Sequence, residues 1–154
     1  AAGGPVSSTR IRELVGAGEI AQANELLGAP YTAHGVVMPG RRLGRTLGFP
    51  TLNVAWVPDL QPRFGVYTVQ VRGAKAAGAI PGVANYGVRP TVGGDASPQL
   101  EVHLLDDCPY GPGDAVTVEW LRFLRPEMKF AGLDDLKNQV MRDREEARKD
   151  FSLR

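Results

Sequence analysis

The sequence has few of the residues on which many functional sites depend. Its 154 residues include one cysteine, Cys108, and two histidines, His34 and His103, which stand far apart. A single cysteine excludes an internal disulfide, and the two histidines offer no zinc-ligand spacing. This cysteine usage is typical of a reducing compartment, so we expect a cytoplasmic protein.

Long apolar runs and an excess of one charge are also missing. The formal net charge is +1, from 18 basic and 17 acidic residues, which does not favour a strongly basic nucleic-acid binder. No stretch approaches the roughly 20 apolar residues of a membrane span, and the first residues carry no export signal. We therefore expect no membrane and no nucleic-acid partner. The chain is 43% hydrophobic and has the length of one domain, so it can form a core.

The residues that are present divide the chain near Pro30. Residues 7–27 have the apolar spacing of one or two short helices, which Gly28 can end. After Pro30, glycine and proline recur and separate six candidate strands: Tyr31 to Val37, Thr51 to Val54, Gly65 to Val71, Ala79 to Tyr86, Leu100 to Leu105, and Ala115 to Phe123. The last segment is again helical, with an apolar stripe of Leu133, Leu136, Val140 and Ala147. This order predicts an all-β barrel or sandwich with a flanking helix.

The segment GRRLGRTLGFPTLN, residues 40–53, has the composition of an anion-binding loop. Its glycines let the backbone approach a bulky anion, and its arginines are donors suited to phosphate oxygens. It is not a Walker A motif, because no Gly-Lys-Ser/Thr sequence occurs. An ordinary turn with surface arginines explains the same composition.

Thr51 and Asn53 end this segment at the start of a predicted strand. They are two residues apart, so their side chains project to the same side. A hydroxyl and an amide oxygen beside a phosphate loop could complete the shell of Mg²⁺.

Glu101 lies in QLEVHLLD, where the alternation of residues predicts a strand with two unlike faces. If its face lines a pocket, Glu101 could accept a proton from an attacking hydroxyl. A solvated glutamate explains the spacing as well, and His103 on the same face is more simply structural.

Several blocks of the sequence, taken in order, resemble the riboflavin kinase domain, which occurs alone in eukaryotes and as the C-terminal half of bacterial bifunctional riboflavin kinase and FAD synthetase. The blocks cover roughly residues 31 to 150 and are GRTLGFPTLN, GVY, ANYGVRPTVG, EVHLLD, YG and LRPEMKF. One departure is Leu52, which stands where the family signature has alanine. The resemblance implies a small six-stranded antiparallel Greek-key barrel with a C-terminal helix, and the helical pattern of residues 7–27 adds a short N-terminal helical extension.

The resemblance also implies transfer of the γ-phosphoryl group of ATP to the 5′-hydroxyl of riboflavin, giving FMN and ADP. Glu101 matches the catalytic base, and Thr51 and Asn53 match the residues that hold Mg²⁺ and the nucleotide phosphates. The further nucleotide-binding residues that it implies are Gly40, Gly44, Arg45, Gly48 and Tyr110. The residues that it places beside the flavin are Arg125, Glu127 and Phe130.

The N-terminal stretch VSSTRIRELV resembles the closing motif of the adenylyltransferase half of the bifunctional enzymes. We therefore divide the chain into a helical remnant of that domain, residues 1–29, and a riboflavin kinase domain, residues 30–154. No H-x-G-H element is present, because His34-Gly35 is followed by Val36. We expect a fragment of a bifunctional enzyme that makes no FAD by itself and whose natural partner is the adenylyltransferase domain. Whether the N-terminal helices pack on the barrel is left open by the sequence.

Two other functions are open at this point. One is a flavin-binding module that has lost catalysis, against which the intact Thr51, Asn53 and Glu101 argue. The other is a barrel that binds single-stranded nucleic acid through the arginine loop and stacking aromatic rings. The basic residues outside the loop are interleaved with nearly as many acids, which does not favour this second alternative.

Overall fold

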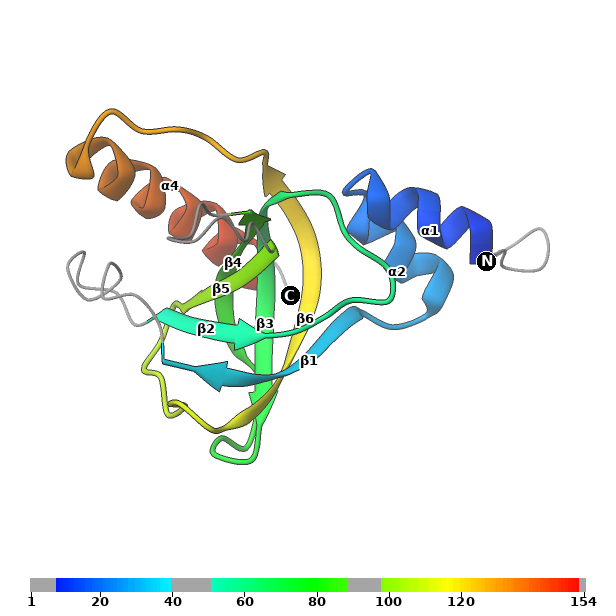
Figure 1. Ribbon diagram of the computed structural model, residues 1–154, viewed down its shortest axis with the longest axis horizontal. Helices are drawn as coiled ribbons and strands as arrows, with labels where there is room; N and C mark the ends of the chain where they lie inside the picture. The colour runs from blue at the N-terminus through cyan, green and yellow to red at the C-terminus, as the bar shows by residue number, and fades with distance from the viewer. Residues whose placement is uncertain (1–7, 40–50, 89–97, 153–154) are drawn as a thin grey trace, which may run out of the picture.

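The computed structural model describes residues 8–39, 51–88 and 98–152, which form a barrel of antiparallel strands flanked by helices (Figure 1). In chain order the described elements are α1 (Ser8–Gly16), α2 (Ile20–Leu27), β1 (Tyr31–Met38), β2 (Thr51–Ala55), β3 (Gly65–Gly73), β4 (Ile80–Val88), β5 (Pro98–Leu104), β6 (Ala115–Arg125) and α4 (Leu133–Ser152). All six predicted strands are confirmed, and no strand end differs from the prediction by more than two residues. The first helical stretch is two helices.

The strands close into a barrel in the order β1-β2-β5-β4-β3-β6. The consecutive strands β3, β4 and β5 form a meander, and β2 returns beside β5 instead of beside β3. The connection between β2 and β3 therefore crosses one end of the barrel, and the connection between β5 and β6 crosses the other. This is the predicted Greek-key topology.

The interior of the barrel is filled by apolar side chains that alternate with outward-facing ones along each strand. At its centre are the fully buried rings of Trp120, Tyr67 and Tyr86, with ring centroids 4.7 Å apart for Tyr67 and Trp120 and 5.8 Å apart for Tyr86 and Trp120. Large aromatic rings in edge-to-face contact stabilise a core beyond their buried area. The barrel is therefore a packed solid, and any ligand site must lie on its outside or at its ends.

The two N-terminal helices share this core with the barrel. Leu14 and Val15 of α1 and Ile20 and Ala23 of α2 belong to the same buried cluster as the strands. Asn24 of α2 fastens the contact, because its amide donates to the Trp120 carbonyl at 2.7 Å and accepts from the Tyr31 amide at 2.7 Å. The sequence had left open whether these helices pack on the barrel, and in the structure they do. The helix end predicted at Gly28 is confirmed, since Gly28 adopts φ 74° and its N–H caps the Asn24 carbonyl.

Helix α4 lies on the opposite side of the barrel from α1 and α2, against β4 and β6 (Figure 1). Beneath it Val66, Val83 and Leu105 form a second apolar cluster with Ala147. The predicted apolar stripe is wrong at Leu133, which is 53% exposed. The reason is that the first turn of α4 extends beyond the strands it covers (Figure 1). Among the described helices none is long and apolar enough to span a membrane.

Candidate active site

The outer surface of β2, β5 and β4 brings the predicted polar residues together. The strand registers place Glu101 of β5 directly opposite Asn53 of β2 on one side and Asn85 of β4 on the other. All three residues are half-buried, whereas Leu100 and Val102 on either side of Glu101 point into the core. Opposite residues of antiparallel strands have Cβ atoms about 4.5–5.5 Å apart. The predicted catalytic carboxylate therefore has an amide side chain as its neighbour on each flanking strand.

A second row of outward residues lies one pleat along the same three strands. Here Thr51 is opposite His103, and His103 is opposite Val83, which α4 covers. The predicted ligands Thr51 and Asn53 therefore share one face with Glu101.

The side chain of His103 has a lowered pKa. Burial lowers this pKa most, and the positive charge of the nearby Arg144 lowers it further, while Asp143 raises it, which leaves the pKa at about 4. His103 is therefore neutral at pH 7, as expected for a histidine enclosed between a sheet and a helix.

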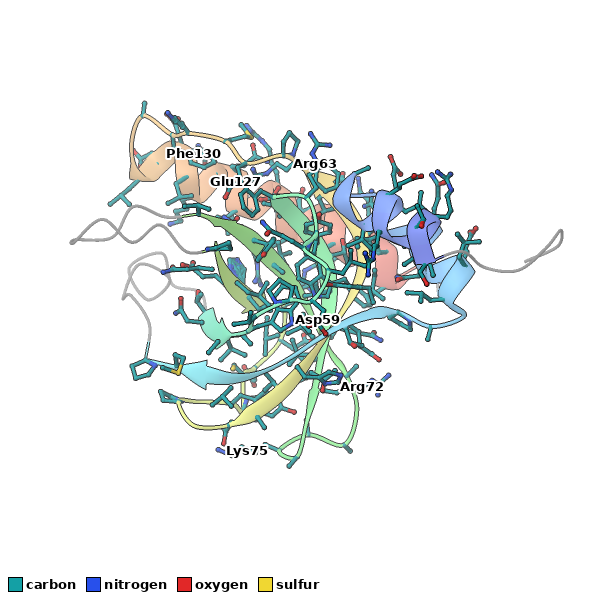
Figure 2. All side chains as sticks on the ribbon, turned by 45° about the vertical axis from the view of Figure 1, so that its right-hand side comes forward. Asp59, Arg63, Arg72, Lys75, Glu127 and Phe130 are labelled. Atoms are coloured by element: carbon teal, nitrogen blue, oxygen red, sulfur yellow. The ribbon has the colours of Figure 1, made fainter. Side chains whose placement is uncertain are left out.

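Glu127 reaches the same surface from the segment that joins β6 to α4, residues 126–132 (Figure 2). Its carboxylate lies against Gly87 of β4, where an added methyl group would overlap it. Gly87 is two residues from Asn85 and shares its outward face. The predicted flavin residue Glu127 is therefore on the face that carries Glu101, two residue pairs farther along β4 and β5.

Arg125 and Phe130 flank Glu127 in the chain. The guanidinium of Arg125 donates to Asp143 of α4 and to the Pro126 carbonyl, and it lies 6.0 Å from the centroid of the half-buried Phe130 ring. These contacts fix Arg125 between the last strand and the last helix. The structure thus brings Phe130 and Glu127 to the edge of the site, and it gives Arg125 protein partners there.

The side chain of Tyr110 is not brought to this surface. Its ring is 6% exposed and fills the end of the barrel against Gly73, inside the wall. The following turn is bonded to the end of β1, because the Gly113 amide donates to the Val37 carbonyl at 2.8 Å. A nucleotide role for Tyr110 remains a prediction, and its buried position leaves the backbone of this turn as the part nearest the surface.

The predicted loop residues Gly40, Gly44, Arg45 and Gly48 lie outside the described residues, and their roles remain predictions. The strands on either side of that loop are described. Met38, the last residue of β1, is opposite Asn53 of β2, so the chain leaves and re-enters the barrel beside the candidate site.

Two further residues of the site were not predicted from the sequence. Asn85 lies in a stretch that the sequence indicates first as a strand end and turn and only second as a pocket wall, although the alternation in ANYGV contains the signal for its outward orientation. Asp143 carried no signal, because its role depends on α4 packing against β6.

Comparison with known proteins is consistent with this geometry. Residues 27–151 match the family model described as Flavokinase: Riboflavin kinase. The chain is 45% identical over 148 residues to the bifunctional riboflavin kinase/FMN adenylyltransferase of Escherichia coli K12, covering 96% of this chain and 47% of that protein. The chain thus spans about half the length of the curated relatives it matches.

Two solved structures share the fold. A crystal structure described as a macrolide-efflux protein from Streptococcus pneumoniae matches with a TM-score of 0.83 and 35% identity, over 93% of this chain and 46% of that one. The riboflavin kinase of Trypanosoma brucei matches with a TM-score of 0.56 and 22% identity, over 80% of each chain. Because the family model covers most of the chain, including all six strands, this protein belongs to the riboflavin kinase family.

Proposed function

We propose that this chain is a riboflavin kinase, which transfers the γ-phosphoryl group of ATP to the 5′-hydroxyl of riboflavin and releases FMN and ADP. The observation that carries the proposal is the placement of Glu101 between Asn53 and Asn85, on the outward face that Thr51 shares. Such a face offers one group that can take a proton beside neutral groups that can bind phosphate and metal. Family membership supplies the identity of the substrates.

Glu101 acts as the base in this proposal. Its carboxylate orients the 5′-hydroxyl and takes its proton as the oxygen bonds to the γ-phosphorus, while the bond from that phosphorus to the β,γ-bridging oxygen breaks and ADP leaves. The amide N–H groups of Asn53 and Asn85 would then hold the carboxylate or the phosphates in line. Phosphoryl transfer depends mainly on such alignment and on neutralising charge.

The donor atoms present fit Mg²⁺. Thr51 and Asn53 offer uncharged oxygens on one face, and the described residues contain no cluster of three or more His, Cys, Asp or Glu side chains that could hold a metal unaided. Mg²⁺ suits such a site, because it takes most of its ligands from phosphates and water. Thr51 and Asn53 would hold the ion, which would neutralise charge on the transferring group.

The flavin is assigned to the side of the face bounded by Glu127 and Phe130. An isoalloxazine ring is flat and largely apolar, and the half-buried Phe130 offers it a surface. Glu127 would then accept hydrogen bonds from the polar atoms of the flavin. The adenylyltransferase activity named for the Escherichia coli relative is assigned to the part of that protein which this chain does not match.

The test is a phosphorylation assay with riboflavin, ATP and Mg²⁺, in which the flavin products are separated and read by fluorescence. We expect FMN and no FAD, and we expect FMN formation to fall strongly in Asn53→Ala. A parent protein that binds flavin without forming FMN would indicate a catalytically silent module. Binding of single-stranded nucleic acid in place of flavin and ATP would overturn the proposal entirely.

A further inference from the structure

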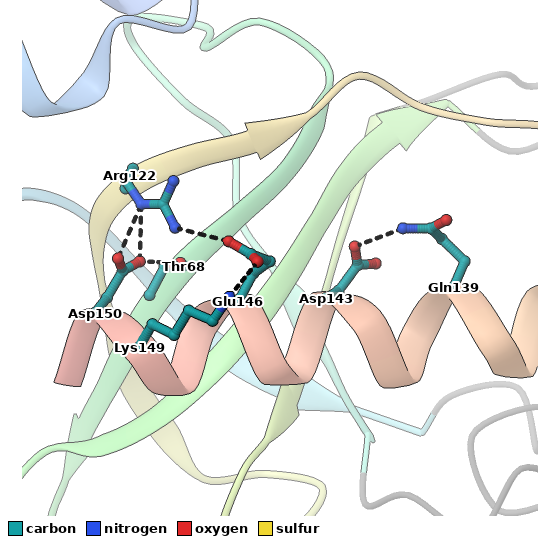
Figure 3. Close-up of polar contacts among 7 residues, drawn as sticks. All are labelled: Thr68, Arg122, Gln139, Asp143, Glu146, Lys149 and Asp150. Carbon is teal, nitrogen blue, oxygen red and sulfur yellow. Dashed lines mark hydrogen bonds and ion pairs between the residues drawn. The ribbon is translucent and has the colours of Figure 1, made fainter. Parts of the chain in front are cut away.

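Two arginine–aspartate pairs join β6 to α4, and they have the same chemistry in different surroundings. Arg125 donates through Nε and Nη2 to Asp143, with distances of 3.0 Å and 2.8 Å to its two carboxylate oxygens. Arg122 donates through Nε to both oxygens of Asp150, at 3.0 Å and 2.9 Å (Figure 3). Two arginines of one strand thus each hold one aspartate of the same helix.

The first pair is the more enclosed of the two. The side chains of Arg125 and Asp143 are 16% and 8% exposed, whereas those of Arg122 and Asp150 are 43% and 20% exposed. Gln139 also donates to Asp143 at 3.0 Å from the preceding turn of α4 (Figure 3). If the carboxylate of Asp143 is removed, the largely buried guanidinium of Arg125 loses its fixed orientation, because few water molecules can reach it to replace the carboxylate.

Within the part of the chain that the structure describes, it is the first pair that contacts the segment beside the candidate site. Arg125 Nη1 donates to the Pro126 carbonyl at 3.0 Å, and the guanidinium lies over the Phe130 ring. Between these two residues stands Glu127, whose carboxylate lies against Gly87. By contrast, Asp150 is hydrogen-bonded to Arg122 of β6 and to Thr68 of β3 (Figure 3).

From this difference we infer that Asp143 is a positioning residue for the flavin: it orients Arg125, and Arg125 in turn orients the Pro126–Phe130 segment. The inference rests on the proposed function, which places riboflavin against Glu127 and Phe130. In this arrangement Arg125 works through its protein contacts, and Asp143 contacts no substrate. Asp143 also faces His103, the residue opposite Thr51, but its hydrogen bonds to Arg125 are directed to the flavin side.

The test compares Asp143→Asn with the matched control Asp150→Asn in the complete chain. We expect Asp143→Asn to raise the KM for riboflavin about tenfold, which corresponds to a loss of about 1.4 kcal/mol of binding free energy. The KM for ATP should stay within about twofold of the parent value, because the nucleotide groups are on β2. Asp150→Asn should lower the melting temperature while leaving both KM values unchanged. Equal effects of Asp143→Asn on the two KM values would overturn the inference.

A second variant covers the case in which Asp143→Asn does not fold. Arg125→Lys keeps a positive charge beside Asp143, but one ammonium group cannot reproduce the fork that reaches both Asp143 and Pro126. We expect this variant to melt close to the parent and to show a raised riboflavin KM, while Arg122→Lys leaves it unchanged. The double variant Arg125→Lys/Asp143→Asn should raise the KM no further than the larger single effect. If the increases in riboflavin KM of the two single variants multiply in the double variant, Asp143 does not act through Arg125.

Failure of the inference and failure of the proposed function give different results. If the parent forms no FMN, the proposed function fails, and the variants are then compared by the dissociation constant for riboflavin, measured through flavin fluorescence. A weaker riboflavin affinity in Asp143→Asn but not in Asp150→Asn would still support positioning. Equal affinities in both variants would refute it.

Discussion

Neighbouring residues of β5 face two different environments. Leu100, Val102 and Leu104 point into a closed apolar core, while Glu101 and His103 point to the outer surface of the barrel. On the inside, a change of side chain alters how well the core is filled. On the outside, it alters charge and hydrogen bonding beside the candidate site or beneath α4. The strand therefore separates stability from activity at a spacing of one residue, and substitutions on β5 and on the neighbouring strand β4 test that separation.

The largest expected effect is on activity, from Glu101→Gln. The amide keeps the shape of the carboxylate but cannot take a proton, so kcat for riboflavin phosphorylation should fall by about 100- to 10,000-fold. The KM for ATP should change little, because phosphate and metal contacts are assigned to Thr51 and Asn53. Steady-state kinetics with both substrates measure this. Retention of most of the parent kcat would remove Glu101 from the mechanism.

The inner face should respond in stability instead. Leu104 is 1% exposed, so Leu104→Ala leaves a cavity in the core and should lower the free energy of unfolding by about 2–5 kcal/mol. Below its melting temperature the variant should keep the parent kcat. Denaturant unfolding measures the loss, and Leu104→Met, which nearly conserves volume, should cost less than about 1.5 kcal/mol. A large fall in kcat under conditions where Leu104→Ala is fully folded would mean that the inner face of β5 also determines activity.

His103 combines outward orientation with burial under α4, and it should make stability depend on pH. Its pKa is about 4 in the folded chain and about 6.5 when unfolded, so the unfolded state gains the proton first as pH falls. Stability is therefore lost between pH 7 and pH 4, by up to about 3 kcal/mol. The groups that face His103 include Arg144, which opposes protonation, and Asp143, which favours it.

The measurement compares unfolding free energies at several pH values for the parent and His103→Gln. The variant should lose less stability than the parent on going from pH 7 to pH 4.5. His34→Gln is the control, because His34 is exposed on β1 and bonded to Thr117 at 2.9 Å. Parallel pH curves for the parent and His103→Gln would contradict the expected role.

The smallest expected effect comes from Gly87→Ala on β4. The added methyl group would overlap the Glu127 carboxylate, which lies at the end of a flexible side chain and can swing away at little cost in stability. We expect the riboflavin KM to rise roughly tenfold, equivalent to about 1.4 kcal/mol. Gly78→Ala, with no atom near the added methyl, should leave the KM unchanged. An unchanged riboflavin KM in Gly87→Ala would show that Glu127 does not contribute to flavin binding.

The strands and the shared face of Thr51 and Asn53 could be predicted because their signals are local. Alternation in QLEVHLLD orients Glu101 and His103 whatever the strand pairs with. The pairing of Glu101 with Asn53 and Asn85 needed the barrel, since it depends on the register of β2 and β4. For the same reason the buried position of Tyr110 could not be predicted from YG, which is equally typical of an exposed turn.

By itself the sequence determined which segments form strands and helices, which face of each strand is apolar, and which family the chain resembles. These follow from periodicity and from ordered motifs, which are properties of neighbours along the chain. Only the tertiary structure decided that α1 and α2 share the core of the barrel, that Leu133 stays exposed, and that Asp143 holds Arg125. The physical reason is that burial and ion pairing are contacts between residues far apart in sequence, and they exist only once the barrel has closed and α4 has packed against it.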